Sequence, residues 1–103
     1  MLKKLLVVMS VLLSINAVNA GKLSSCQFKG IALYGKVKFV DSFADIKIQI
    51  VNSFPDLKVQ LVKGFANECG KWQVVDNFPD FTVQVVSAFP DIKVQKVSSF
   101  PGL

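Results

Sequence analysis

The chain has 103 residues, a net charge of +5 and no histidine, and lysine supplies all of its positive charge. Zinc sites need clusters of histidine and cysteine, and nucleophile–histidine catalysis needs a histidine beside the nucleophile, so this composition excludes both for practical purposes. Nucleic-acid surfaces normally use arginine for bidentate and stacking contacts, so lysines spread singly beside aspartates fit solvated strand faces better. We therefore expect no cofactor, no metal of the zinc type and no nucleic-acid partner.

Residues 1–20 have the features of a signal peptide. Residues 1–4 include two lysines, residues 5 to roughly 15 are mostly apolar, and residues 18–20 end in small side chains suited to cleavage. We predict cleavage near Ala20 and a secreted or periplasmic mature protein without a membrane span. The alternative is an uncleaved anchor, which a short apolar run broken by Ser10 and Ser14 disfavours.

Residues 21–33 are predicted to be an N-terminal lead-in. Residues 21–25 are small and polar, whereas residues 26–34 hold enough apolar side chains for a strand or a covering segment. Residues 34–103 are predicted to form one repeated-strand β domain. A chain this short buries too little surface to be very stable without a covalent or other support.

Cys26 and Cys69 are the only cysteines, and both lie after the predicted cleavage site. In an exported small domain, such a pair is expected to form a disulfide. In the chain-entropy model, a loop of this length stabilises a domain by about 4 kcal/mol. The alternative is two separate buried thiols.

A short motif is repeated through the second half of the chain. The sequence FPDLKVQLV at 54–62 recurs as FADIKIQIV at 43–51, FPDFTVQVV at 78–86 and FPDIKVQKV at 89–97. The alternation of apolar and polar residues is typical of half-buried strands, which we interpret as antiparallel. Proline should keep the preceding phenylalanine extended, and Pro-Asp favours a type I turn at the strand end.

Phenylalanines mark two nested periods in the sequence. They stand at 43, 54, 65, 78, 89 and 100, at intervals of eleven except for one of thirteen. A second period of 35 superimposes residues 35–65 on residues 70–100, with about half of the positions identical. Eleven is odd, so each unit must absorb one residue in a turn or bulge to keep one face buried. We predict an internally duplicated all-β domain of about six to seven short strands.

Two sets of residues are candidates for binding. Asp45, Asp56, Asp80 and Asp91 share one repeat position and could gather carboxylates for calcium, although each aspartate capping its own turn is favoured. Tyr34 and Trp72 could form an aromatic platform for sugar or peptide. Trp72 superimposes on Val37, however, so core packing is favoured for it. The six phenylalanines are expected to pack under the sheet ends, because exposed together they would form an unusually apolar surface.

No set of residues predicts catalysis. A pair of carboxylates could hydrolyse a glycoside, but Glu68 is the only glutamate and lies next to Cys69. We therefore predict that the protein is not an enzyme and has no catalytic residues.

The repeats resemble a known family. Ala44-Asp45 matches the repeated Ala-Asp of the septoil-knot domain family, and Gly70-Lys71-Trp72 matches its Gly-x-Trp, while prolines at 55, 79 and 90 replace its usual alanine. The resemblance runs from about Tyr34 to Phe100. It implies a small β-rich bacterial domain whose backbone is tied into a seven-crossing torus knot, with no established activity. Periodicity and composition do not indicate a knot, and the general rule that chains avoid threading argues against one.

These observations favour an exported, non-catalytic structural or protein-interaction domain with an unknown protein partner. The alternative is a carbohydrate- or calcium-binding β module that uses the repeated rim. A toxin or inhibitor is a third class without specific support. The sequence leaves the oligomeric state, the strand order and any ligand open.

Overall fold

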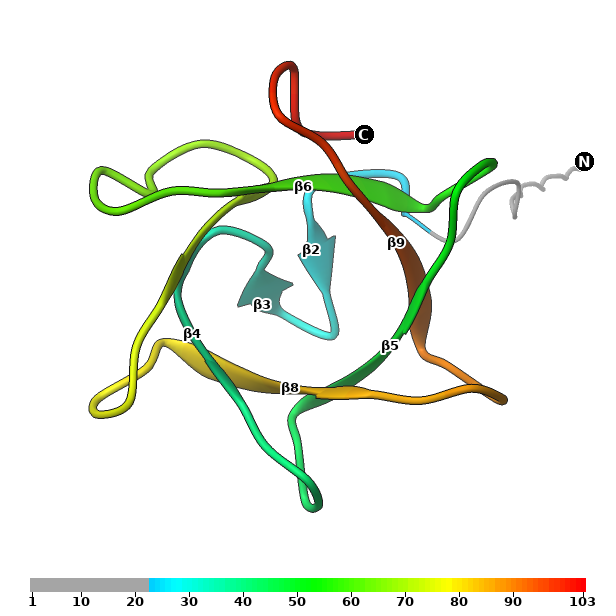
Figure 1. Cartoon of the computed structure of the whole chain (residues 1–103), viewed down its shortest axis with the longest axis horizontal. Helices are drawn as coiled ribbons and strands as arrows, with labels where there is room; N and C mark the ends of the chain where they lie inside the picture. The colour runs from blue at the N-terminus through cyan, green and yellow to red at the C-terminus, as the bar shows by residue number, and fades with distance from the viewer. Residues whose placement is uncertain (1–22) are drawn as a thin grey trace, which may run out of the picture.

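The computed structural model describes residues 23–103, so the signal-peptide prediction for residues 1–20 lies outside the described residues. Six strands close into a barrel in the order β4-β7-β6-β9-β5-β8 (Figure 1). A two-stranded hairpin precedes the barrel in sequence. The strands are β2 (Gln27–Phe28), β3 (Ile31–Ala32), β4 (Gly35–Phe39), β5 (Ile46–Ile50), β6 (Leu57–Leu61), β7 (Lys71–Val74), β8 (Phe81–Val85) and β9 (Ile92–Lys96). The described residues are thus all-β, as predicted.

Neighbouring strands of the barrel are parallel, so our interpretation of them as antiparallel was wrong. Apolar alternation shows only that one face of a strand is buried. It does not reveal the direction of the neighbouring strand. Parallel neighbouring strands are usually connected by helices that cover both faces of the sheet. In this barrel, short loops connect the strands, and the outer wall faces solvent.

The chain makes two interleaved laps around the barrel. β4, β5 and β6 form the first lap, and the strands of the second lap fill the places between them: β8 lies between β4 and β5, and β9 lies between β5 and β6. β6 and β7 are the only consecutive strands of the barrel that pair directly. Each copy of the duplicated sequence therefore makes one lap, and equivalent residues of the two laps are 35 residues apart.

A constant stagger places equivalent residues of the barrel at the same level. Val37, the third residue of β4, pairs with Phe81, the first of β8, and the same step recurs from β8 to β5, from β5 to β9 and from β9 to β6. Because the strands are inclined, a two-residue step between neighbours keeps equivalent positions level. In the five-residue strands, the first and third residues form two buried layers that make the core, and the fifth residues form a third layer at the end where the strands finish. Gly70, Trp72 and Val74 take the equivalent places at β7.

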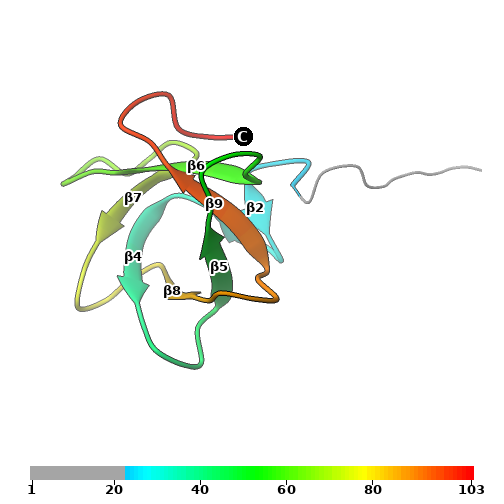
Figure 2. The same cartoon turned by 45° about the vertical axis from the view of Figure 1, so that its right-hand side comes forward.

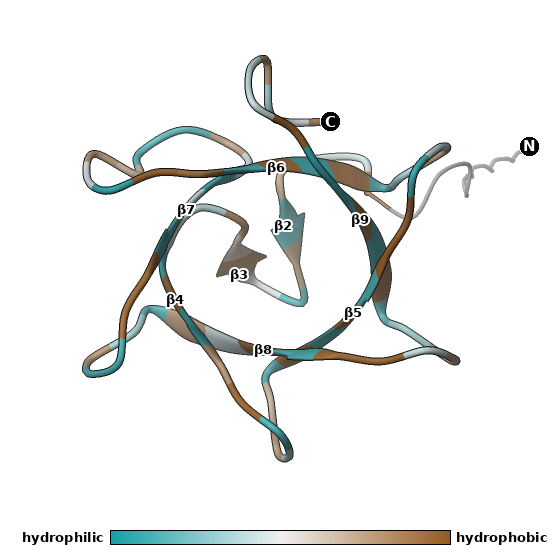
Figure 3. Cartoon of the chain, viewed as in Figure 1, coloured by the Kyte–Doolittle hydropathy of each residue, from teal (hydrophilic) through white to brown (hydrophobic). Residues whose placement is uncertain are grey.

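Connecting loops absorb the odd residue of each eleven-residue unit. The segments 40–45, 51–56, 62–70, 75–80 and 86–91 join the strands, and residues 97–103 follow β9. These loops leave the ring in different directions around it (Figures 1 and 2). Hydropathy alternates along the barrel strands, and apolar stretches continue into the loops (Figure 3).

The hairpin closes the end of the barrel at which the strands begin. Phe28 and Ile31 pack against the core, and the backbone carbonyl of the fully buried Leu33 accepts a hydrogen bond of 3.1 Å from Trp72 Nε1. Cys26 and Cys69 form the predicted disulfide, with Cα atoms 5.8 Å apart. The disulfide therefore ties the segment that closes the barrel to the junction between the two laps.

Gly35 and Gly70 begin the two copies for a steric reason. Both have a positive φ, +122° and +83°. A Cβ at Gly35 would collide with the Asp80 carboxylate, and one at Gly70 would collide with the Lys58 carbonyl oxygen. Only glycine allows the close backbone approach at these two points.

Candidate interaction surface

The six phenylalanines of the repeat are exposed, which contradicts our expectation that they pack under the sheet ends. Their exposed fractions run from 88% to 100%, for Phe43, Phe54, Phe65, Phe78, Phe89 and Phe100. Each lies in the loop after a strand and has a φ between 53° and 58°. Four of them precede proline and are in the left-handed region, so the prediction that proline keeps them extended was also wrong. We call these six residues the phenylalanine tips.

The left-handed conformation makes phenylalanine a costly choice at these positions. A non-glycine residue with a positive φ costs about 1–2 kcal/mol, and bulky side chains are uncommon there. Burial could offset that cost, but the tips are almost fully solvated. Phenylalanine at the tips therefore adds almost no buried contact to the barrel. A residue with a conformational cost and no such contact suggests a role outside the fold.

The four repeated aspartates hold neighbouring strands together rather than capping their own turns. Each carboxylate accepts a hydrogen bond from a backbone N–H on a strand of the other lap. The donors and distances are Thr82 N to Asp45 Oδ2, 2.9 Å; Lys93 N to Asp56 Oδ2, 2.7 Å; Lys36 N to Asp80 Oδ2, 2.8 Å; and Lys47 N to Asp91 Oδ2, 2.8 Å. The backbone N–H of Asp56, Asp80 and Asp91 completes each of these links by donating to the carbonyl oxygen of the same strand residue, as from Asp91 N to Lys47 O at 2.7 Å. Asp45 N donates instead to Thr82 Oγ1 at 2.9 Å.

These aspartates are separated around the barrel and do not form a common site. Each one serves a different pair of strands, and residues 23–103 contain no group of three or more metal-ligating side chains. The structure thus brings each aspartate to a strand partner, and none of them to another aspartate.

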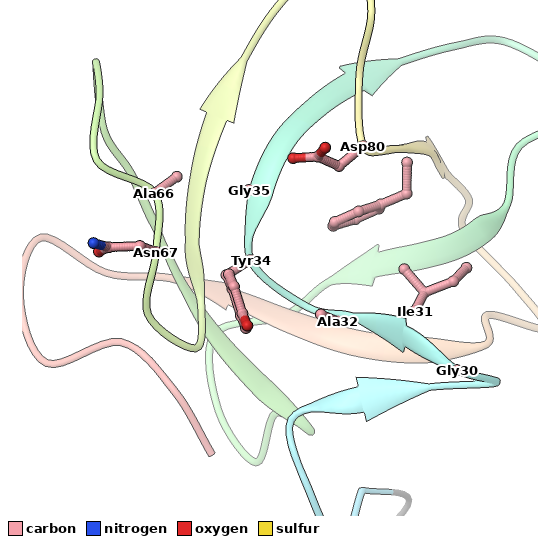
Figure 4. A pocket seen from close by; sticks show the side chains of 9 residues that line it. Gly30, Ile31, Ala32, Tyr34, Gly35, Ala66, Asn67 and Asp80 are labelled. Carbon is pink, nitrogen blue, oxygen red and sulfur yellow. The ribbon is translucent and has the colours of Figure 1, made fainter.

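Trp72 and Tyr34 occupy different environments and form no shared platform. Trp72 is only 1% exposed and packs edge-to-face on Phe81 with ring centroids 5.6 Å apart, as its place on the apolar strand face indicated. Tyr34 is 39% exposed at a hollow of about 510 Å³ beside the hairpin (Figure 4). Asn67 and Asp80 also line this hollow, but one Asp80 oxygen is engaged by Lys36 N.

The end of the barrel where the strands finish carries a partly exposed apolar rim. Five apolar side chains, each 40–52% exposed, form this rim, and Lys96 occupies the sixth position. The apolar members are Phe39, Ile50, Leu61, Val74 and Val85. Two hollows interrupt this rim at equivalent places. One of about 230 Å³ lies between β4 and β8 next to Asp41, and one of about 360 Å³ lies between β9 and β6 next to Lys96.

One ion pair lies at the junction between the laps. Lys71 Nζ is 2.7 Å from Glu68 Oε1 on the surface. The hydrogen bond from Lys71, and then its charge, hold the pKa of Glu68 below its ordinary value. The ion pair with Lys71 gives Glu68 a structural role at this junction.

The regular spacing marks the tips as a series, but we expected them in the interior. A signal for exposure was present, because polar or small residues precede each phenylalanine and alanine or proline follows it, as in a turn. Within residues 23–103, no helix is long and apolar enough to cross a membrane.

Comparison with known proteins identifies a family for the chain. No curated protein matches it. The family model described as the 7(1) septoil knot domain matches residues 30–103, which cover both laps of the barrel and the second strand of the hairpin. The chain therefore belongs to the septoil knot domain family.

Proposed function

We propose that this protein is an exported, non-catalytic interaction domain, in which the barrel is a rigid scaffold and the phenylalanine tips bind other protein surfaces. The observation that carries the proposal is the combination of 88–100% exposure with a left-handed backbone at all six tips. Aromatic side chains dominate the energetics of protein interfaces, and conformational cost at an exposed residue is retained where it serves binding.

The arrangement of the tips favours a partner that engages several of them. A single phenylalanine buries about 150–250 Å², whereas a stable interface buries about 800 Å² on each partner. One tip is therefore too small an anchor. A scaffold that repeats the same anchor can reach useful affinity through several simultaneous contacts.

A carbohydrate-binding role would use the hollow beside Tyr34, where an exposed aromatic ring lies near Asn67 and Asp80. The calcium-binding role has weaker support, because the repeated aspartates already accept strand hydrogen bonds and are not grouped. Titration of the ¹⁵N-labelled protein with oligosaccharides and then with calcium tests both roles. Shifts confined to the amides of residues 30–35 and 80 would favour the carbohydrate role over our proposal.

Photo-crosslinking at a tip tests the proposed function. A benzophenone amino acid replaces Phe89 in cells that produce the protein, and the adducts are identified by mass spectrometry. We expect protein adducts that excess wild-type protein suppresses and that a variant with all six tips changed to asparagine does not suppress. The same probe at Lys47, on the outer wall of β5, is the control. Adducts that both competitors suppress equally would contradict a role for the tips.

A further inference from the structure

The phenylalanine tips and the hollows of the barrel rim are complementary features on one chain. The tips project from the loops that follow the strands, and the two hollows lie where the strands end. Apolar side chains form part of each lining: Leu61 and Val97 line the hollow next to Lys96, and Val40 and Val85 line the smaller and more polar hollow next to Asp41. Each is large enough to admit one aromatic ring, and the chain's own tips remain exposed instead of filling them.

Charges near the tips match charges at the hollows. Asp76 lies two residues before the tip Phe78, and the hollow between β9 and β6 contains Lys96. Lys63 lies two residues before the tip Phe65, and the hollow between β4 and β8 contains Asp41. All four residues except Lys96 lie in loops, and all four are exposed. The acidic tip thus suits the basic hollow, and the basic tip suits the acidic hollow.

From this match we propose that the occupant of the rim hollows is a second copy of this chain. Phe78 of one copy inserts into the hollow next to Lys96 of another, and Phe65 inserts into the hollow next to Asp41. This inference rests on the proposed function, because it uses the same tips and names their partner.

The contact is heterologous, since the Phe78 tip follows β7 while the hollow that receives it lies between β9 and β6, at another place around the barrel. Such contacts close into rings or continue as open assemblies, in contrast to a symmetric pair that stops at a dimer. The loops leave the barrel around its circumference (Figure 1), so the tips of one copy do not all face a single neighbour. Association therefore continues beyond the dimer as concentration rises.

Sedimentation velocity of the purified mature protein, from about 1 μM to about 1 mM, tests the inference. The wild-type weight-average mass rises with concentration beyond that of a dimer. Phe78→Asn weakens association about 10- to 100-fold, the effect expected from losing the burial of one aromatic side chain. Lys47→Gln changes a lysine on the outer wall and leaves association unchanged.

A charge-reversal pair tests the specific contact. Asp76→Lys and Lys96→Glu each weaken association about two- to five-fold at low salt, because each places like charges together at the edge of the contact. The double variant regains the wild-type association, since the opposite charges are restored in the reverse order. Circular dichroism and urea unfolding confirm that each variant is folded.

Three outcomes would overturn the inference. These are a wild-type protein that stays monomeric at about 1 mM, one that stops at a dimer, and a double charge reversal that fails to restore association. Binding of the monomer to phosphatidylcholine vesicles through Phe78, without self-association, would assign the tips to a lipid surface instead. If the protein stays monomeric while crosslinking at Phe89 yields adducts with other proteins, this inference fails and the proposed function stands.

Discussion

Phe78 and Phe81 lie three residues apart and have opposite surroundings. Phe81 is buried against Trp72 at the first level of the barrel, whereas Phe78 stands in solvent with a left-handed backbone. The difference comes from position in the repeat, because Phe81 begins a strand and Phe78 lies in the loop before it. Hydrophobicity alone therefore does not predict which phenylalanines form the core.

The strand-linking aspartates are predicted to contribute to stability. Asp91→Ala leaves the backbone N–H of Lys47 without its carboxylate acceptor, and we expect a loss of about 1–2 kcal/mol in the free energy of unfolding. Urea denaturation monitored by circular dichroism measures the loss.

Asp41→Ala is the matched control, because Asp41 lies in a loop and its carboxylate makes no hydrogen bond to another described residue. Equal destabilisation by the two substitutions would contradict the assigned role of Asp91.

The glycines at the start of each copy allow neighbouring segments of the chain to approach closely. Gly70→Ala adds a Cβ against the Lys58 carbonyl oxygen in a left-handed conformation, and should cost about 3 kcal/mol or more. Gly64→Ala is the control, since a Cβ there meets nothing within 4 Å. We expect the control to match or slightly exceed wild-type stability, because alanine reduces the freedom of the unfolded chain. Similar urea midpoints for the two variants would contradict this account.

The disulfide is expected to secure the hairpin on the barrel. The double substitution Cys26→Ser and Cys69→Ser removes a crosslink that spans 43 residues, with an expected loss of about 4 kcal/mol in the chain-entropy model. Trp72 lies beneath the hairpin segment, so its fluorescence should shift to the red if that segment detaches. A variant with wild-type stability and an unchanged emission maximum would show that the disulfide is not needed to hold the hairpin.

The two-lap path has a kinetic consequence for the whole molecule. Every neighbouring pair in the barrel except β6 and β7 joins strands that are not consecutive in sequence, and such non-local pairing folds slowly. A threaded chain must also be untied before it is fully unfolded. We expect chains denatured for seconds to refold faster than chains denatured for days.

A double-jump experiment in urea tests this expectation. Prolyl isomerase is added during refolding, because proline isomerisation also produces slow phases over tens of seconds. Refolding rates that do not depend on the denaturation time, once isomerisation is catalysed, would contradict a kinetic role for the knot.

The sequence predicted the all-β class, the duplication, the disulfide and the family resemblance, because strand alternation, a period of 35 and two cysteines are local or countable features. It did not predict parallel pairing, since the same alternation suits a strand with a neighbour of either direction. The burial of Trp72 followed from its superposition on Val37. The exposure of the tips did not follow, because the position of a loop outside the barrel depends on the path of the whole chain.

We predict that the phenylalanine tips serve binding and not the stability of the fold. The most direct test is urea unfolding of a monomeric variant in which all six tips are asparagine, a residue that tolerates the left-handed conformation. We predict a free energy of unfolding equal to or greater than that of the wild-type monomer at the same low concentration. A loss of several kcal/mol would show that the phenylalanines support the fold, and would contradict the account.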